Sequence, residues 1–166
     1  MNTSRLGTLT AAVLLTDAAA HLYWLTGRTW PAHDVRSLSL AVLNLEVPFT
    51  PRVLVPLAAV LTTGAVAVLA RSRGRGGLPA RLVTGAVAAG TLVRAAAGLV
   101  WILGIGADTA TPFYWLNLIV YTPLCAAMAT AAGLLTLRPL APAARPPHPT
   151  GPAATLSRTA GRAARP

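Results

Sequence analysis

The chain has 166 residues, of which 54% are hydrophobic and only 11% are charged, and its mean hydropathy is +0.59. A soluble domain carries about 25% charged residues because its surface must be hydrated, so this composition excludes an ordinary soluble fold. The formal net charge is +10, from 14 arginines and no lysine against four acidic residues. These arginines flank apolar segments and lack the interleaved aromatic residues that stack on bases, which argues against a nucleic-acid partner. The single cysteine, Cys125, excludes an internal disulfide.

Four apolar segments predict transmembrane helices, at about residues 6–26, 53–70, 82–105 and 114–137. A helix needs about 20 residues to cross the roughly 30 Å of hydrocarbon in a bilayer. Backbone polar groups find no water there, so each segment must be helical. The predicted fold is therefore all-α, a polytopic membrane protein whose residues 1–138 form a bundle of four transmembrane helices. Pro123 predicts a kink in the last helix, with Thr122 capping the freed carbonyl.

The connections and the C-terminal part differ in composition. Residues 27–52 form a long first connection, and its central part, residues 35–47, mixes apolar and polar residues. This part predicts a short helix, and whether it lies along the membrane interface is left open. Residues 139–166 are rich in Pro, Ala and Arg, so they predict a disordered cytoplasmic tail that buries too little surface to offset its ordering entropy.

The arginine positions predict the topology. Arg71, Arg73, Arg75 and Arg81 lie in or beside the second connection, and further arginines begin the tail. Positive residues near helix ends stay on the cytoplasmic side, so we expect a multi-pass protein of the cell membrane with both termini cytoplasmic. Aromatic side chains favour the headgroup level. On this topology all four tryptophans lie toward the outer interface: Trp24, Trp30, Trp101 and Trp115.

Ionisable residues interrupt the first and third segments. Asp17 and His21 are four residues apart and share a helix face. Arg94 lies at a similar depth, roughly 18–20 Å from the cytoplasmic end at 1.5 Å per residue. An isolated charge in mid-membrane costs about 2.5–3.5 kcal/mol. We therefore predict an Asp17–Arg94 ion pair inside the bundle, with the small residues Ala86 and Gly90 letting the third helix approach a neighbour.

The fourth segment adds Asn117 and Tyr121 on one helix face. The candidate polar cluster consists of Asp17, His21, Arg94, Asn117 and Tyr121. Intramembrane ionisable residues are typical of a substrate, proton or lipid-headgroup site. The alternative is a polar clasp that only selects which helices pair. No metal-ligand spacing or cofactor motif is present, and haem is disfavoured because His33 and His148 lie outside the predicted helices.

The run His21-Leu-Tyr-Trp24-Leu-Thr-Gly27 resembles the H-x-y-W-x-x-G signature of a family of small bacterial membrane proteins, domain of unknown function 3995. Residues 92–95 and 113–125 resemble the same family, and the resemblance covers roughly residues 8–137. It implies a four-helix membrane domain and no known activity. The family usually has a second Gly in place of Arg28 and an Asp in place of Asn117. Proton chemistry by that acid would be lost with Asn117, whereas a hydrogen-bonding role would survive.

Three functions remain open from the sequence. The first is a bundle that binds or passes a small molecule or lipid. The second is an intramembrane enzyme acting on a lipid or isoprenoid, with His21 and Asp17 as acid-base residues, which requires hydrogen-bond reach of the substrate. The third is a structural membrane assembly subunit whose basic tail docks to anionic lipid. The lipid bilayer is the expected partner in each case, and homo-oligomerisation is left open.

Overall fold

Four long apolar helices make up most of the described part of the chain. The computed structural model describes residues 2–139, so the predicted tail from residue 140 onward lies outside the described part. Three of these helices are continuous, α1 (Thr3–Leu25), α3 (Pro51–Ser72) and α4 (Gly77–Ile102). The fourth, Pro112–Leu137, consists of α5 (Pro112–Leu116), the π-helical turn η1 (Asn117–Tyr121) and α6 (Thr122–Leu137). All four are long and apolar enough to cross a membrane, which confirms the predicted all-α polytopic fold.

Glycines account for the largest difference from the predicted helix bounds, which is in the third transmembrane helix. We expected the third transmembrane helix at about residues 82–105, whereas α4 spans Gly77–Ile102. Gly76 precedes its first turn with a φ of 83°, a left-handed conformation that suits glycine. Gly104 and Gly106 also have positive φ, at 81° and 73°, and they lie beyond the last turn. The apolar run continues past Ile102, so hydropathy alone overestimates the helix there.

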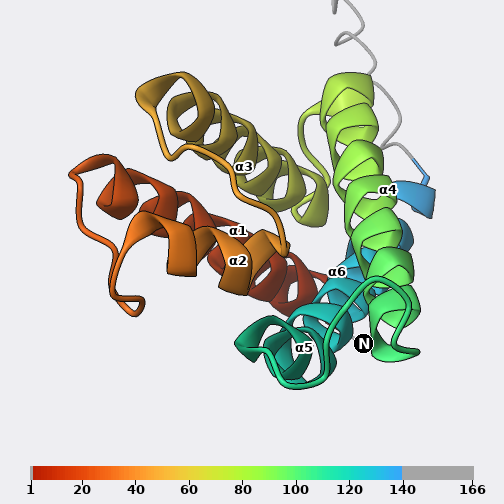
Figure 1. The fold of residues 1–166 in the computed structure, drawn as a ribbon. Helices are drawn as coiled ribbons and strands as arrows, with labels where there is room; N and C mark the ends of the chain where they lie inside the picture. The colour runs from red at the N-terminus through yellow and green to blue at the C-terminus, as the bar shows by residue number, and fades with distance from the viewer. Residues whose placement is uncertain (1, 140–166) are drawn as a thin grey trace, which may run out of the picture.

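The helices form two pairs. α1 packs along α3, and α4 packs along α6. Between the pairs, α3 contacts α4 most extensively, and α6 contacts α1 and α3. Figure 1 shows α1 and α3 side by side, with α4 set at an angle to them. A buried apolar cluster joins α1, α3 and α6, and its members are Ala11, Leu14, Ala65, Val68, Met128 and Leu135. Van der Waals packing among these side chains holds α1, α3 and α6 together.

The two ends of the bundle differ. At the loop end lie residues 26–50 and 103–111, and at the turn end lie the N-terminus, the short α3–α4 connection and the end of α6. The loop end contains α2 (Val35–Leu43), which confirms the short helix predicted within residues 35–47. Asp34 caps α2 by accepting from the Ser37 backbone N–H at 2.7 Å, and these hydrogen bonds hold the pKa of Asp34 below its ordinary value. Asn44 Nδ2 donates to the Gly106 carbonyl at 2.9 Å and joins the two loops.

The last span adjusts to Pro123 by a π-helical turn. Thr122 N–H donates to the carbonyl of Asn117, five residues earlier, immediately before the proline. Such single turns insert one residue into a helix and re-aim the side chains around them. The predicted cap by Thr122 is wrong, because its buried hydroxyl has no hydrogen-bond partner among the described residues. The π-helical turn places Asn117 wholly inside the bundle, where its side chain is 0% exposed.

Candidate functional site

Arg94 is the centre of the polar site. Its Nη1 donates to Oδ1 of Asn117 at 3.0 Å, and its guanidinium lies over two aromatic rings. The guanidinium carbon is 4.9 Å from the ring centroid of Trp101 and 5.5 Å from that of Tyr121. Aromatic faces attract a cation through the ring quadrupole, and this attraction strengthens where water is excluded. The side chain is therefore held by one amide and two rings.

Asn117 links Arg94 to the backbone of α4. Its Nδ2 donates to the Gly98 carbonyl at 2.8 Å, so the amide uses both its donor and its acceptor between α4 and η1. An added Cβ on Gly98 would overlap the Thr122 hydroxyl and lie 3.2 Å from Oδ1 of Asn117. The helices approach closely here because residue 98 has no side chain. This close approach brings Asn117 within reach of both Arg94 and the α4 carbonyl.

Asp17 and His21 form a second polar group on α1. His21 Nδ1 lies 2.8 Å from the Asp17 carbonyl and 3.4 Å from Asp17 Oδ1. Since a carbonyl only accepts, Nδ1 carries the proton in this contact. The Asp17 side chain is 52% exposed and that of His21 is 16% exposed. His21 also meets the edge of Trp24 at a centroid distance of 5.3 Å, and Trp24 in turn packs on Phe49.

The predicted Asp17–Arg94 ion pair is wrong. Among residues 2–139 the ion pairs within 4.0 Å are Asp17–His21 and Arg36–Glu46. Asp17 and Arg94 do sit at matching depth, each eight residues before the last residue of its helix. However, α1 packs against α3 and α6, whereas α4 packs against α6 and α3, so α1 and α4 are not neighbours. Equal depth is necessary for an ion pair, but the order of helices around the bundle decides whether it forms.

The predicted close approach at Ala86 and Gly90 is also wrong. Both residues are exposed, and no atom lies within 4 Å of an added Cβ at Gly90. Gly98 has this role instead, and Gly85 faces Thr136 of α6 at an ordinary van der Waals distance. Both of these glycines lie on the face of α4 that meets α6. Small residues do allow α4 to approach a neighbouring helix, but on a different face from the one that Ala86 and Gly90 predicted.

α6 connects the two polar groups. α6 contacts α4, which carries Arg94, and α1, which carries Asp17 and His21. Tyr121, in η1 immediately before α6, has its ring centroid 5.5 Å from the guanidinium carbon of Arg94. The five predicted residues divide into a contacting set of Arg94, Asn117 and Tyr121 and a separate pair of Asp17 and His21. Among the described residues, no group of three or more His, Cys, Asp or Glu side chains could hold a metal ion.

Two residues have roles that the sequence analysis missed. Trp101 was assigned only to the headgroup level, but it forms one wall of the Arg94 site. Its seven-residue separation from Arg94, two helical turns, places both on one face and could have indicated this. Arg71 was counted only as a topological charge, yet it is 3% exposed and donates to the Arg138 carbonyl at the end of α6. No local pattern distinguishes Arg71 from the exposed Arg73 beside it.

The remaining tryptophans gather at the loop end, as the aromatic pattern predicts. Trp24 Nε1 donates to the Trp30 carbonyl at 3.2 Å, and Trp115 meets the ring of Tyr114 edge-on. Tyr114 donates its hydroxyl to the Ile102 carbonyl at 3.3 Å, which ties η1 and α5 to the end of α4. The loop end is therefore rich in aromatic rings, and one of them, that of Trp101, contacts Arg94.

Comparison with known proteins identifies one family. The model of the family described as Protein of unknown function (DUF3995) matches residues 14–132, which include all five predicted site residues. No curated protein and no solved structure matches the chain.

Proposed function

Because the chain belongs to this family, whose description gives no activity, we propose from the site geometry that it is a membrane bundle that binds a small amphiphilic anion, with Arg94 as the anchor. The carrying observation is the uncompensated charge of Arg94. Its only hydrogen-bond acceptor among residues 2–139 is the neutral amide of Asn117, and no carboxylate lies within 4.0 Å. A charge inside a membrane is normally paired or faces a binding site.

The site favours a ligand with a carboxylate or phosphate at one end and an apolar body. Arginine presents five N–H donors in a planar fork, and one donor group is used by Asn117. The remaining donors suit a two-oxygen anion. Trp101 and Tyr121 provide aromatic walls for the apolar body beside that anion. Arg94 is half-buried, so part of the residue remains accessible.

The proposal includes a location in the cell membrane with both termini on the cytoplasmic side. The four apolar helices support membrane insertion. The turn end carries arginine without any acidic residue among those described, which supports its assignment to the cytoplasm. The Arg94 site then lies in the outer half of the bilayer, about 12 Å from the loop end of α4 at 1.5 Å per residue.

The enzymatic alternative receives less support. Acid-base work by His21 requires a free nitrogen aimed at a substrate and a partner that orients the ring. Nδ1 of His21 already donates to the Asp17 carbonyl, and the carboxylate of Asp17 is half exposed. This contact orients the ring, but neither residue touches Arg94, Asn117 or Tyr121 in the hydrogen bonds of the described residues. The geometry therefore favours binding at Arg94 over catalysis at His21.

A fluorescence titration tests the proposed function. We would place wild type, Arg94→Gln and Arg81→Gln in nanodiscs of neutral phosphatidylcholine and add dodecanoate, following tryptophan emission because Trp101 forms the site wall. A hydrogen bond to a charged group contributes about 1.5–3 kcal/mol, and 1.4 kcal/mol is tenfold in affinity. We expect saturable binding that weakens about tenfold or more in Arg94→Gln.

Arg81 is the matched control, because it lies on the same helix at the turn end. Arg81→Gln should bind dodecanoate within about twofold of wild type, since it removes the same charge far from the site. Equal, non-saturable emission changes in all three proteins would show simple partitioning into the bilayer. That result would reject the binding proposal and leave the polar residues as a clasp between α4 and α6.

A further inference from the structure

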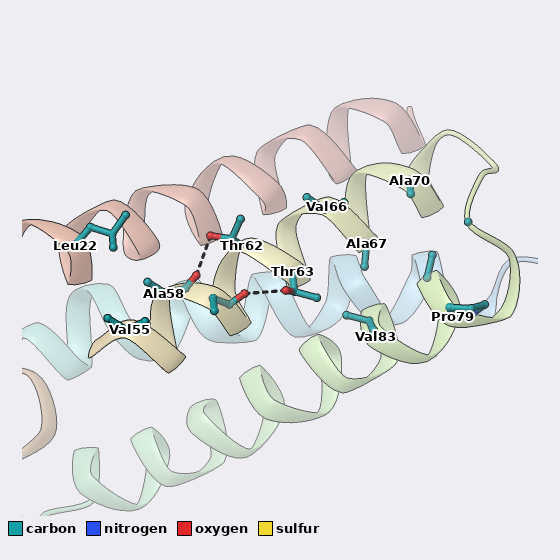
Figure 2. A pocket seen from close by; sticks show the side chains of 13 residues that line it. Leu22, Val55, Ala58, Thr62, Thr63, Val66, Ala67, Ala70, Pro79 and Val83 are labelled. Carbon is teal, nitrogen blue, oxygen red and sulfur yellow. Dashed lines mark hydrogen bonds between the residues drawn. The ribbon is translucent and has the colours of Figure 1, made fainter. Parts of the chain in front are cut away.

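A long apolar groove lies on a different face of the bundle from the Arg94 site. Its volume is about 810 Å³, and none of the five predicted site residues lines it. One wall is α3 along its length, from Val55 near the loop end to Ala70 at the turn end. The other wall is the start of α4, where Pro79, Ala80 and Val83 contribute. Figure 2 shows these walls, with Leu22 of α1 at the far end of the groove.

An occupant of the groove does not need to supply hydrogen-bonding groups. Its two hydroxyl groups are satisfied within α3, since Thr62 donates to the Ala58 carbonyl and Thr63 to the Ala59 carbonyl, both at 2.8 Å (Figure 2). The other lining side chains are mostly Ala and Val. An apolar groove whose polar groups already have hydrogen-bond partners suits a hydrocarbon chain.

The turn end of the groove is positively charged. Arg73 and Arg75 are exposed and lie in the connection between Ala70 and Gly76, two residues that line the groove. Arg75 N–H donates to the Ala70 carbonyl at 2.8 Å, which closes this turn tightly against the groove. Apolar walls that end at exposed arginines match a molecule with an anionic head and an apolar tail.

We propose that this groove binds one acyl chain of an anionic phospholipid, whose phosphate contacts Arg73 and Arg75. The leaflet is the one facing the α3–α4 connection. From Ala70 to Val55 the groove is about 22 Å long at 1.5 Å per residue. One leaflet contributes about 15 Å of the roughly 30 Å hydrocarbon core, so the chain covers α3 from Ala70 to about residue 60. Thr63 lies beneath it. This site is separate from the Arg94 site and does not depend on the function proposed there.

Native mass spectrometry of the full chain tests whether the arginines at the groove bind an anionic headgroup. The probes are phosphatidylglycerol and phosphatidylcholine with identical palmitoyl-oleoyl chains, offered in equal amounts. Each arginine near a membrane surface contributes about 1 kcal/mol toward anionic lipid, or about fivefold. We expect wild type to retain phosphatidylglycerol preferentially, and the double variant Arg73→Gln/Arg75→Gln to lose about 25-fold of that preference. Equal retention of both lipids by wild type, or unchanged preference in the double variant, would overturn the assignment of the headgroup.

A variant that blocks the groove tests whether the acyl chain lies in it. Thr63→Phe should fill the groove and reduce retained phosphatidylglycerol several-fold, because the larger side chain leaves no room for the acyl chain. Val93→Phe is the matched control, since Val93 is 69% exposed on α4 and does not line the groove. The outcome that contradicts the proposal is equal phosphatidylglycerol retention in both variants. The Arg94 proposal is tested with dodecanoate and Arg94→Gln, and this proposal with phosphatidylglycerol and Arg73→Gln/Arg75→Gln, so the failure of each is distinguishable.

A second copy of the chain is the competing occupant. It would be detected by replacing Thr63 with cysteine in a Cys125→Ser background and oxidising native membranes. Efficient disulfide dimers would show that another protomer covers the groove and would overturn the lipid assignment. Monomers under oxidation, together with preferential retention of phosphatidylglycerol, are the expected result.

Discussion

Gly98 holds the tightest contact between α4 and α6. Its carbonyl accepts from Asn117, and its missing side chain leaves room for the Thr122 hydroxyl. The position therefore has two functions, because it permits the helix approach and keeps a carbonyl open to the amide that holds Arg94. Small residues commonly allow such approaches between membrane helices.

We expect Gly98→Ala to destabilise the bundle. The new Cβ would overlap the Thr122 hydroxyl and approach Thr122 Cβ to 3.1 Å. Overpacking of this kind costs about 1–3 kcal/mol, which exceeds the gain of at most about 1 kcal/mol from replacing helical glycine with alanine. Unfolding in detergent, followed by circular dichroism, measures the change.

Gly90→Ala is the control for helix propensity, because no atom lies within 4 Å of its added Cβ. This variant should be neutral or slightly more stable. In Gly98→Ala the further change Thr122→Ala should restore part of the stability, since it removes the overlapping hydroxyl. No recovery in the double variant would show that the Gly98 contact is not the cause.

At the scale of elements, Arg71 joins the end of α3 to the end of α6. It is 3% exposed, and its Nη2 donates to the carbonyls of Arg138 and Pro139. The last four carbonyls of a helix have no partner within it, and a cation there also interacts favourably with the helix dipole. Arg71 thus fastens the turn end of the last helix to a helix that is distant in sequence.

Removing this fastening should destabilise the turn end. Arg71→Met keeps an unbranched apolar side chain and removes the donors, and a hydrogen bond to a charged group contributes about 1.5–3 kcal/mol. We expect a loss of that order in detergent unfolding and faster hydrogen exchange in the last turn of α6. Arg73→Met, at an exposed position two residues later, should change stability by less than about 0.5 kcal/mol. Similar losses in both variants would refute a specific role for Arg71.

The elements also show what the sequence could and could not predict. Hydropathy identified all four spans because a bilayer requires long apolar helices. Facing positions along one helix were predictable from periodicity, which grouped Asp17 with His21 and Asn117 with Tyr121. The Asp17–Arg94 pairing failed because depth along a helix says nothing about which helices are neighbours. Predicting that order needs side-chain packing between helices, such as Gly98 against Thr122, and local patterns do not contain it.

The two ends of the whole molecule differ: positive charge is concentrated at the turn end, and the tryptophans lie at the loop end. The loop end carries all four tryptophans and mixed charges, including the Arg36–Glu46 ion pair at 2.7 Å. In the described part of the turn end, all charged side chains are positive: Arg5, Arg71, Arg73, Arg75, Arg81 and Arg138. An even number of spans places the beginning of α1 and the end of α6 at the same end of the bundle. Both proposed sites follow this polarity, with Arg94 toward the loop end and the groove arginines at the turn end.

This polarity predicts the topology, and reporter fusions measure it. Positive residues beside helix ends are retained in the cytoplasm, so the α3–α4 connection should be cytoplasmic and the loop before α5 should be outside. We expect alkaline phosphatase to be active when fused after Asp108 and inactive when fused after Gly76, with green fluorescent protein giving the reverse pattern. Gly76 is the appropriate junction because Arg81 already lies within α4. Phosphatase activity only at Gly76 would invert the protein and place Arg94 in the inner leaflet. Activity on the same side at both junctions would mean that α4 does not cross the membrane, and the Arg94 site would then lose its membrane setting altogether.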